Sequence, residues 1–167
     1  MAMKATFRGR AELTRKLEQM APLAAKYTAD EKIAIANEAA AQMSASAPRG
    51  ETGAYAASIQ GDRLSNRAGR ALVGGGINQS KDPDATGIFA DYIWRFLEFG
   101  AIGHVIKAKS STTLANGSGE FFGPNVKHPG STARPHIFHN WRAMRKKSAA
   151  RIRRAALKGV KEALGKK

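Results

Sequence analysis

The chain has 167 residues, of which 43% are hydrophobic, and it carries four histidines, no cysteine and a formal net charge of +15. A chain of this length buries one core, so we expect a single domain over residues 1–167. The absence of cysteine excludes disulfides, thiolate metal sites and cysteine nucleophiles. No apolar run has the length of a signal peptide or a membrane span, so a cytoplasmic origin and no membrane partner are expected.

The positive charge is concentrated toward the C-terminus. Residues 134–167 hold 12 lysines and arginines against one acid, Glu162, a net charge of +11, whereas residues 1–133 have a net charge of +4. A basic segment of this kind indicates an acidic partner, which is nucleic acid or an acidic protein surface rather than a membrane.

The N-terminal part of the chain is predicted to be helical. Residues 1–27 form an extension with a short helix over residues 10–25. The segment Thr28-Ala29-Asp30-Glu31 has the form of a capping box, a hydroxyl at the N-cap and a carboxylate three residues later, so a second helix is expected to begin at Thr28. Apolar residues recur at helical spacing up to Met43, and Pro48 ends the helix. Its face is rich in alanine and therefore thin, which predicts a close neighbour.

The rest of the segment 28–99 mixes strands and a helix. Residues 52–77 are predicted to form two antiparallel strands with a turn near Ser65-Asn66, followed by a polar loop over residues 78–86. Residues 88–99 are predicted to form a short helix at the centre of the core. Its aromatic residues, expected to be mostly buried, are Phe89, Tyr92, Trp94, Phe96 and Phe99.

The last third of the chain divides into two parts. Residues 100–133, rich in Gly, Ser, Thr and Asn, are predicted to form a long loop or hairpin with strand-like pieces at 104–109 and 120–127. A segment of this kind in a small domain is usually functional or mobile. Residues 134–167 are predicted to form a basic helix that begins at Pro135 and ends near Leu164.

Five cations of this basic helix fall on one stripe. At 100° per residue, their spacings of four, three, four and three align them opposite the apolar side. They are Lys147, Arg151, Arg154, Lys158 and Lys161. One interpretation is a solvated face, since cations favour a helix C-terminus. The other is contact with an acidic protein or DNA, because solvated faces usually mix signs and like charges repel one another.

The four histidines raise the question of a metal site. His136 and His139 lie one helical turn apart, and His104 and His128 lie earlier in the chain. A zinc site usually needs a third ligand of matching spacing and supporting partners, which the pattern does not provide. No Ser-His-Asp order, paired-carboxylate motif or nucleotide fingerprint is present either. We therefore predict no metal ligands, no cofactor, no catalytic residues and no enzymatic activity.

Three short motifs occur in order along the chain. In the first, a helix ending in Ala-Pro is followed by Thr-Gly and Ser-Ile, and its motif residues are Pro48, Thr52, Gly53 and Ser58. In the second, an aromatic helix ends in Glu-Phe-Gly at Glu98, Phe99 and Gly100. The third leads into the basic helix through His128, Pro129, Gly130, Arg134 and Pro135.

Taken in this order, the motifs resemble those of tail-completion or minor tail-component (head–tail neck) proteins of long-tailed double-stranded DNA phages. The resemblance extends over about residues 30–164. Three positions depart from the family pattern: Tyr55 stands where leucine is usual, Ala101 replaces a threonine, and His136 replaces an aromatic residue. Glu98, at the end of an aromatic helix, is expected to anchor either Arg134 or a backbone amide, because an unpaired buried carboxylate is costly.

The resemblance implies an α+β fold, in which an antiparallel sheet is flanked by an N-terminal helix and a long basic C-terminal helix. It implies a structural virion protein of the head–tail junction, made in the cytoplasm of the bacterial host and located in the neck or tail of the virion. The implied partners are further copies of the chain in a ring and neighbouring neck and tail proteins. Those neighbours are head-completion, tail-terminator or tail-tube proteins, and contact with packaged DNA stays open. Sixfold symmetry would match phage tails, and twelvefold symmetry at the portal side is the alternative.

The alternative function is a free-standing basic nucleic-acid-binding protein, in which the last helix neutralises phosphates. This reading predicts tight binding to DNA that weakens steeply with salt. The aromatic residues cluster in the expected core helix and not among the C-terminal cations, so few are left to stack on bases. The sequence therefore favours the structural reading.

Overall fold

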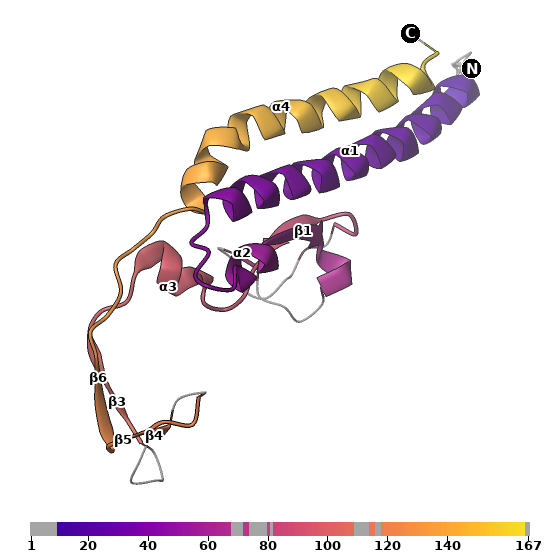
Figure 1. The fold of residues 1–167 in the computed structure, drawn as a ribbon. Coiled ribbons are helices and arrows are strands. Elements are labelled where there is room, and N and C mark those ends of the chain that lie inside the picture. The colour runs from indigo at the N-terminus through magenta and orange to yellow at the C-terminus, as the bar shows by residue number, and fades with distance from the viewer. Residues whose placement is uncertain are drawn as a thin grey trace, which may run out of the picture.

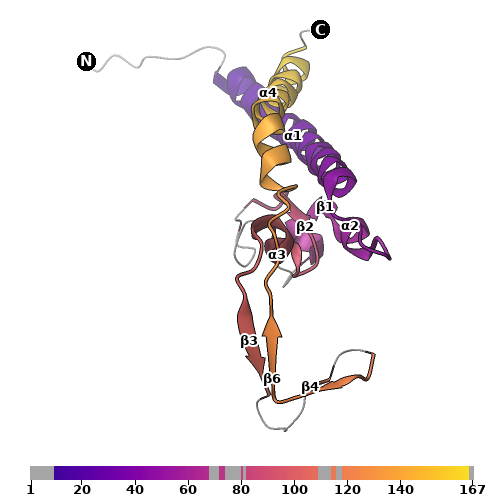
Figure 2. The same cartoon turned by 60° about the vertical axis from the view of Figure 1, so that its left-hand side comes forward.

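A computed structural model describes residues 10–67, 72–73, 80, 82–108, 114–115 and 118–165 of the chain. Two long helices, α1 (Arg10–Ser46) and α4 (Phe138–Ala163), lie side by side, and α1 lies between α4 and a small antiparallel layer (Figures 1 and 2). An arm of short strands projects away from the helices in both views. The fold class is α+β, as the sequence predicts.

Helix α1 is continuous over 37 residues. The hydroxyl of Thr28 donates to the carbonyls of Ala24 and Ala25, both at 2.8 Å, so it bonds back into the helix and caps nothing. The prediction of a helix start at Thr28 is therefore wrong. The physical reason is tertiary, since packing of the preceding turns against α4 carries the helix through a local capping pattern.

The alanine-rich face of α1 lets its neighbours approach closely, as expected. A Cβ atom on Gly61 would lie 2.4 Å from the backbone carbon of Ala36. A Cβ atom on Gly159 of α4 would lie 2.6 Å from the backbone nitrogen of Ala24. Glycine on the neighbour and alanine on α1 therefore bring both the strand layer and α4 down to the backbone of α1.

The first strand of the layer does not pair within residues 52–77, as predicted, but with a strand that comes later in the chain. After the short helix α2 (Ala54–Ser58), β1 (Gln60–Arg63) pairs with β2 (Thr86–Phe89), in the register Gln60↔Phe89 to Arg63↔Thr86. Residues 64–67 form a 3₁₀ helix, η1 (Leu64–Arg67), in place of the predicted turn. The partner strand lies where a polar loop and an aromatic helix were expected. Four residues are too few for periodicity to separate a strand from a helix.

Only the end of the aromatic segment is helical, since α3 spans Trp94–Phe99. Phe89 and Trp94 are buried, whereas Tyr92, Phe96 and Phe99 are exposed, so the prediction that these aromatics are mostly buried is wrong for three of the five. The core lies instead where α1, α2 and the start of α4 meet. Its buried residues are Ala39, Ala40, Met43, Ala47, Tyr55, Ala56, Ile59, Trp94, Ile137 and Met144.

The arm is a narrow antiparallel ribbon within residues 101–130. Strand β3 (His104–Lys107) pairs with β6 (Asn125–His128), and β4 (Leu114–Ala115) pairs with β5 (Phe121–Phe122). The strand-like pieces of this segment are therefore strands. The chain then passes the root of the arm and enters α4 at Phe138, three residues after the predicted start.

Candidate functional site

The second and third motifs meet at the root of the arm. Ala101 and Ser131 exchange two backbone hydrogen bonds of 3.0 and 2.9 Å, which close the ribbon. Gly100 and Gly130 flank this bridge with φ of 77° and 89°, a region that favours glycine. A Cβ atom on Gly130 would lie 2.4 Å from the Ala101 carbonyl oxygen, and one on Gly100 would lie 2.6 Å from that of Ser131. Both motif glycines are therefore needed for the ribbon to leave the body here.

Glu98 anchors the start of α4. Its carboxylate is 3% exposed and accepts the backbone N–H groups of His136, Ile137 and Phe138 at 2.7, 2.9 and 3.0 Å. The first two groups directly precede α4 and the third belongs to its first residue, where N–H groups have no partner within the helix, so Glu98 caps α4 from another part of the chain. Of the two partners considered for Glu98, the structure shows the backbone amides. The Arg134 contact is a backbone bond from its N–H to the Leu97 carbonyl, at 2.7 Å.

The environment of Glu98 favours its charged form. Desolvation of the buried carboxylate alone would raise its pKa, but the three backbone N–H donors together outweigh that cost. The pKa of Glu98 therefore lies below its usual range. A carboxylate held in its charged form at the positive end of α4 is the electrostatic arrangement that stabilises a helix N-terminus.

A second buried contact joins α2 to the same turn. The hydroxyl of Tyr55 lies 2.6 Å from His136 Nε2, and His136 Nδ1 lies 2.7 Å from the Arg134 carbonyl oxygen. A carbonyl only accepts, so we assign a proton to Nδ1, and in this tautomer Nε2 accepts from the hydroxyl of Tyr55. Burial, with help from the charges of Glu98 and Asp91, raises the pKa of Tyr55 to about 12. Tyr55 and His136, two of the three positions that depart from the family pattern, are thus hydrogen-bonded to each other.

The first motif places Tyr55 for this contact. Gly53, with φ of 65°, precedes α2, and the hydroxyl of Thr52 accepts the N–H of Ala54 at 3.3 Å. At the other end of α2, the hydroxyl of Ser58 donates to the Tyr55 carbonyl and accepts the N–H of Asp91, at 2.7 and 3.1 Å. Pro48 follows the end of α1 and is half-buried. The three motifs therefore converge on the N-terminal end of α4.

The five cations of the predicted stripe do not share one environment. Lys147, Arg154, Lys158 and Lys161 are exposed. Arg151 instead faces α1, where its guanidinium pairs with Glu31 and Glu38, and these bonds raise its pKa. The acids that neutralise it lie on the other helix, so a projection of α4 alone did not reveal them. Arg151 therefore lies in the interface between α1 and α4, which we call the seam.

One of the exposed cations, Lys158, also contacts α1. The ammonium of Lys158 lies 4.5 Å from the centroid of the Tyr27 ring on α1, within the range of a cation–π interaction. The hydroxyl of Tyr27 donates to Glu162, the one acid of the C-terminal segment, which raises the pKa of Tyr27. Lys147, Arg154 and Lys161 have no acidic partner within the described part of the chain.

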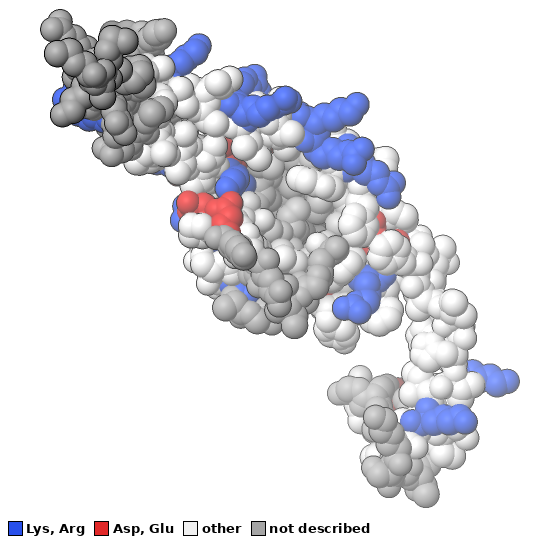
Figure 3. Space-filling view, turned by 180° about the vertical axis from the view of Figure 1, so that it is seen from behind, with Lys and Arg blue, Asp and Glu red and all other residues white. Residues whose placement is uncertain are grey.

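Exposed cations cover more of α4 than the predicted stripe. The stripe missed four exposed members of the same helix, which are Arg142, Arg145, Lys146 and Arg153. Figure 3 shows lysine and arginine side chains gathered along the edge of the body where α4 lies. The net charge of residues 134–167 was the signal that could have found them. With the stripe, eight exposed cations lie on one helix whose first turn is fixed by buried contacts.

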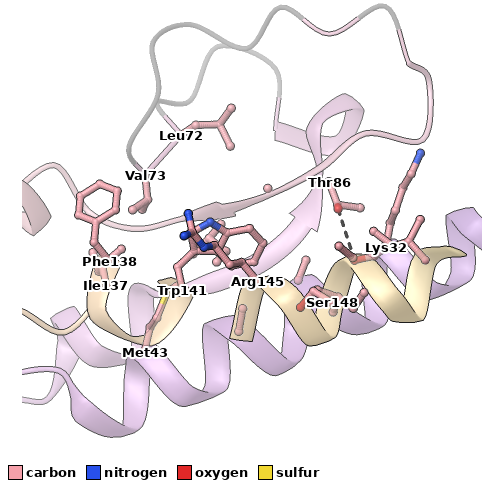
Figure 4. A pocket seen from close by; sticks show the side chains of 17 residues that line it. Lys32, Met43, Leu72, Val73, Thr86, Ile137, Phe138, Trp141, Arg145 and Ser148 are labelled. Atoms are coloured by element: carbon pink, nitrogen blue, oxygen red, sulfur yellow. Dashed lines mark hydrogen bonds between the residues drawn. The ribbon is translucent and has the colours of Figure 1, made fainter. Parts of the chain in front are cut away.

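An apolar groove of about 540 Å³ runs between the two long helices and the strand layer. Trp141 and Arg145 extend into it from α4, and Leu72 and Val73 face it from the opposite side (Figure 4). Trp141 is 40% exposed, so its ring lies at the edge of the core rather than within it.

The histidines do not form a metal centre in the described residues. His104 and His128 stack across the arm with ring centroids 5.1 Å apart, His136 is buried at the anchor, and His139 is exposed on α4. No group of three or more potential ligands that could hold a metal ion occurs within the described ranges. None of the helices in that same part of the chain is long and apolar enough to cross a membrane.

Comparison with known proteins identifies the class to which this arrangement belongs. The model of the family described as "Bacteriophage HK97-gp10, putative tail-component" matches residues 11–100, more than half of the chain. The chain belongs to this family of phage tail components. The match covers α1, the strand layer, α3 and Glu98, while the arm and α4 lie beyond it. No curated protein and no solved structure matches the chain.

The family assignment defines a structural part of the phage tail, and therefore a component of the virion. It supports the phage reading of the motifs, two of which lie inside the matched range. The third motif, from His128 to Pro135, lies outside that range and is connected to the rest by the contacts of Glu98 and Leu97.

Proposed function

We propose that this tail component acts at the junction of head and tail, where it completes the tail and joins it to the head. Its role there is structural and not enzymatic, and it is made in the cytoplasm of the bacterial host before incorporation into the neck. The observation that carries the proposal is α4, which presents eight exposed cations while Glu98 and His136 fix its first turn. A charged helix held in one orientation is suited to docking rather than to turnover.

The proposed partners of α4 are acidic surfaces of neighbouring head-completion, tail-terminator or tail-tube proteins. Electrostatic complementarity mainly sets the encounter rate and the choice of partner. The chain itself is proposed to form a ring, sixfold to match the symmetry of the tail. A ring repeats the basic helix around an axis, so several weak charged contacts act together.

Removal of the gene from a phage genome tests this function. Electron microscopy should show DNA-filled heads and separate tails, because the parts form but do not join. Complementation with the wild-type gene should restore whole particles and serves as the control. Normal infectious particles in the absence of the protein would overturn the proposed function.

The second candidate function is nucleic-acid binding by the free protein, and the observation that favours it is the same set of exposed cations on α4. Binding of the purified chain to duplex DNA, measured by fluorescence anisotropy over a salt series, separates the two. A phosphate-binding protein loses affinity steeply with salt, with a slope that reports the number of phosphates contacted. Weak binding with a shallow slope leaves the acidic protein surface as the partner.

A further inference from the structure

The exposed apolar residues of this protein gather in one segment. Eleven large hydrophobic residues of the described chain are exposed, and eight of them lie between residues 92 and 122. These eight are Tyr92, Phe96, Phe99, Ile102, Val105, Ile106, Phe121 and Phe122. Scattered apolar residues are ordinary on a protein surface, but a concentrated set marks an interaction site. We call these eight residues the apolar surface.

The apolar surface runs from α3 into the arm. Phe96 and Phe99 lie three residues apart in α3, and Tyr92 lies in the turn that precedes this helix. Ile102 follows at the root of the arm and is 90% exposed, and every residue of β3 is exposed. A two-stranded ribbon is marginally stable by itself in water. A cover over the arm, which the described residues of one copy do not supply, would therefore stabilise it.

The charge of the same region differs from that of the rest of the chain. Residues 92–128 carry four basic and two acidic residues, a net charge of +2, against +11 for residues 134–167. Two copies of a chain with a net charge of +15 repel each other most strongly where α4 faces α4. They approach at the lowest cost through the weakly charged apolar surface. Aromatic residues with few charges are also the composition of the core of a permanent interface.

We propose that the apolar surface is the site at which copies of this chain join, with the arm of one copy lying on the α3 side of the next. This inference rests on the proposed ring, since only a head-to-tail contact between unlike patches closes a ring of more than two copies. Phe121 and Phe122 of one arm then cover Tyr92 and Phe96 of the neighbour. The cations of α4 remain free for a different partner.

The absence of cysteine makes a cross-linking test clean. In one copy, α3 and β5 lie at opposite ends of the arm (Figures 1 and 2), so a Tyr92→Cys/Phe121→Cys protein links mainly between copies. Oxidation of the purified full chain should give a ladder of linked species up to the ring on a non-reducing gel. Each single-cysteine variant should give no more than a linked dimer. A double variant that stops at dimers would overturn the head-to-tail contact.

A second measurement tests the surface without cross-linking. Light scattering after size exclusion should show wild type as an oligomer, and Phe96→Lys and Phe121→Lys should each weaken association by at least about tenfold. Leu157→Lys is the matched control, because Leu157 is an exposed large apolar residue of α4 outside the apolar surface, and it should assemble as wild type does. Circular dichroism melts recorded below the concentration at which wild type associates should coincide for all variants, because the substituted side chains are exposed in a single copy.

The outcomes separate this inference from the proposed function. If Phe96→Lys and Phe121→Lys assemble as well as wild type, the apolar surface is not the contact between copies. This outcome leaves the proposed ring itself unaffected. If wild type is monomeric at every concentration, self-association through this surface is refuted, and the neck function is judged by the gene deletion alone.

Discussion

The two ends of α4 differ in their environment, since the start of the helix is held by buried contacts and the other end carries exposed cations. In the first turn, every contact is internal: Glu98 accepts three backbone N–H groups and His136 accepts from Tyr55. Toward the other end, Arg154 and Lys161 are exposed and have no acidic partner in the described residues. The difference shows that the contacts that orient α4 and its unpaired cations lie at different places along one helix. Buried groups, among them the charged carboxylate of Glu98, set the direction of the helix, and we propose that the exposed charges supply the contact with a partner.

Removal of the Glu98 carboxylate should give the largest loss of stability. In Glu98→Ala, three backbone N–H groups of a buried turn lose their acceptor, and the expected cost is about 3–5 kcal/mol in the free energy of unfolding. Glu98→Gln keeps one good acceptor and should cost less. Chemical denaturation measures both, with the exposed Glu51→Gln as a control that should stay within about 0.5 kcal/mol of wild type. A change below about 1 kcal/mol for Glu98→Ala would contradict the anchor.

The same residue predicts a pH dependence. The folded-state pKa of Glu98 lies below its ordinary value of 4.5, so its contribution to stability is present above that value and is lost as the pH falls through the folded pKa. Between pH 6 and pH 3, wild type should therefore lose more stability than Glu98→Gln. Half-buried Asp62 and exposed Asp82, whose pKa values are also lowered, are present in both proteins, so the difference between the two curves isolates Glu98. Parallel curves would show that Glu98 does not carry the effect.

The Tyr55–His136 contact should have the next largest effect. Tyr55→Phe leaves a buried imidazole nitrogen without its donor, at a cost of about 1–3 kcal/mol. Adding His136→Phe removes the orphaned nitrogen as well, so the double variant should be more stable than the sum of the two single changes predicts. Thermal or chemical unfolding of the four proteins gives the coupling energy. Strictly additive changes would mean that the two side chains do not depend on each other.

Arg151 should have an intermediate effect, as expected for a residue of the seam between the helices. Its side chain is 22% exposed and pairs with two acids on α1, so Arg151→Gln should cost about 1 kcal/mol. The exposed Arg153→Gln is the matched control and should leave stability unchanged. Equal melting temperatures of the two variants would show that the ion pairs in the seam contribute nothing measurable.

The exposed cations should have the smallest effect on folding and a large effect on assembly. Changing Lys147, Arg154 and Lys161 together to glutamate should alter stability by less than about 0.5 kcal/mol per site. Because the new glutamates would face the acidic surface of the proposed partner, incorporation into particles should fall by roughly a hundredfold or more. A control that exchanges lysine and arginine at the same three positions keeps the charge and should assemble normally. A triple-glutamate protein that melts and assembles as wild type does would reduce this part of α4 to a solvated face.

Some features were predictable because the cause lies within a short stretch of sequence. The length of α4 follows from its uninterrupted helical pattern between Pro135 and Leu164. The thin face of α1 follows from its alanines. Burial of Glu98 follows from a lone carboxylate among aromatics, and the need for a partner follows from the cost of desolvation.

Other features were not predictable because the deciding contact is distant in sequence. The capping pattern at Thr28 is overridden by α4, which lies more than 100 residues later. The two acidic partners of Arg151 lie on α1, and the strand that pairs with β1 lies beyond residue 80. The pairing of Tyr55 with His136 was visible in sequence only as two unexplained departures from one pattern.

The pairing of α1 with α4 has a consequence for biosynthesis. Helix α1 is translated before α4, against which it packs, and Glu98 is translated 38 residues before His136, the first of its backbone donors. Until residues 136–138 and α4 are made, the alanine face of α1 has no α4 to pack against, and the carboxylate of Glu98 has no backbone N–H groups to accept from. Contacts of such long sequence separation slow folding and delay it until α4 has been translated. Nascent chains stalled before Phe138 should therefore be protease-sensitive and should require chaperones, whereas released full-length chains should not.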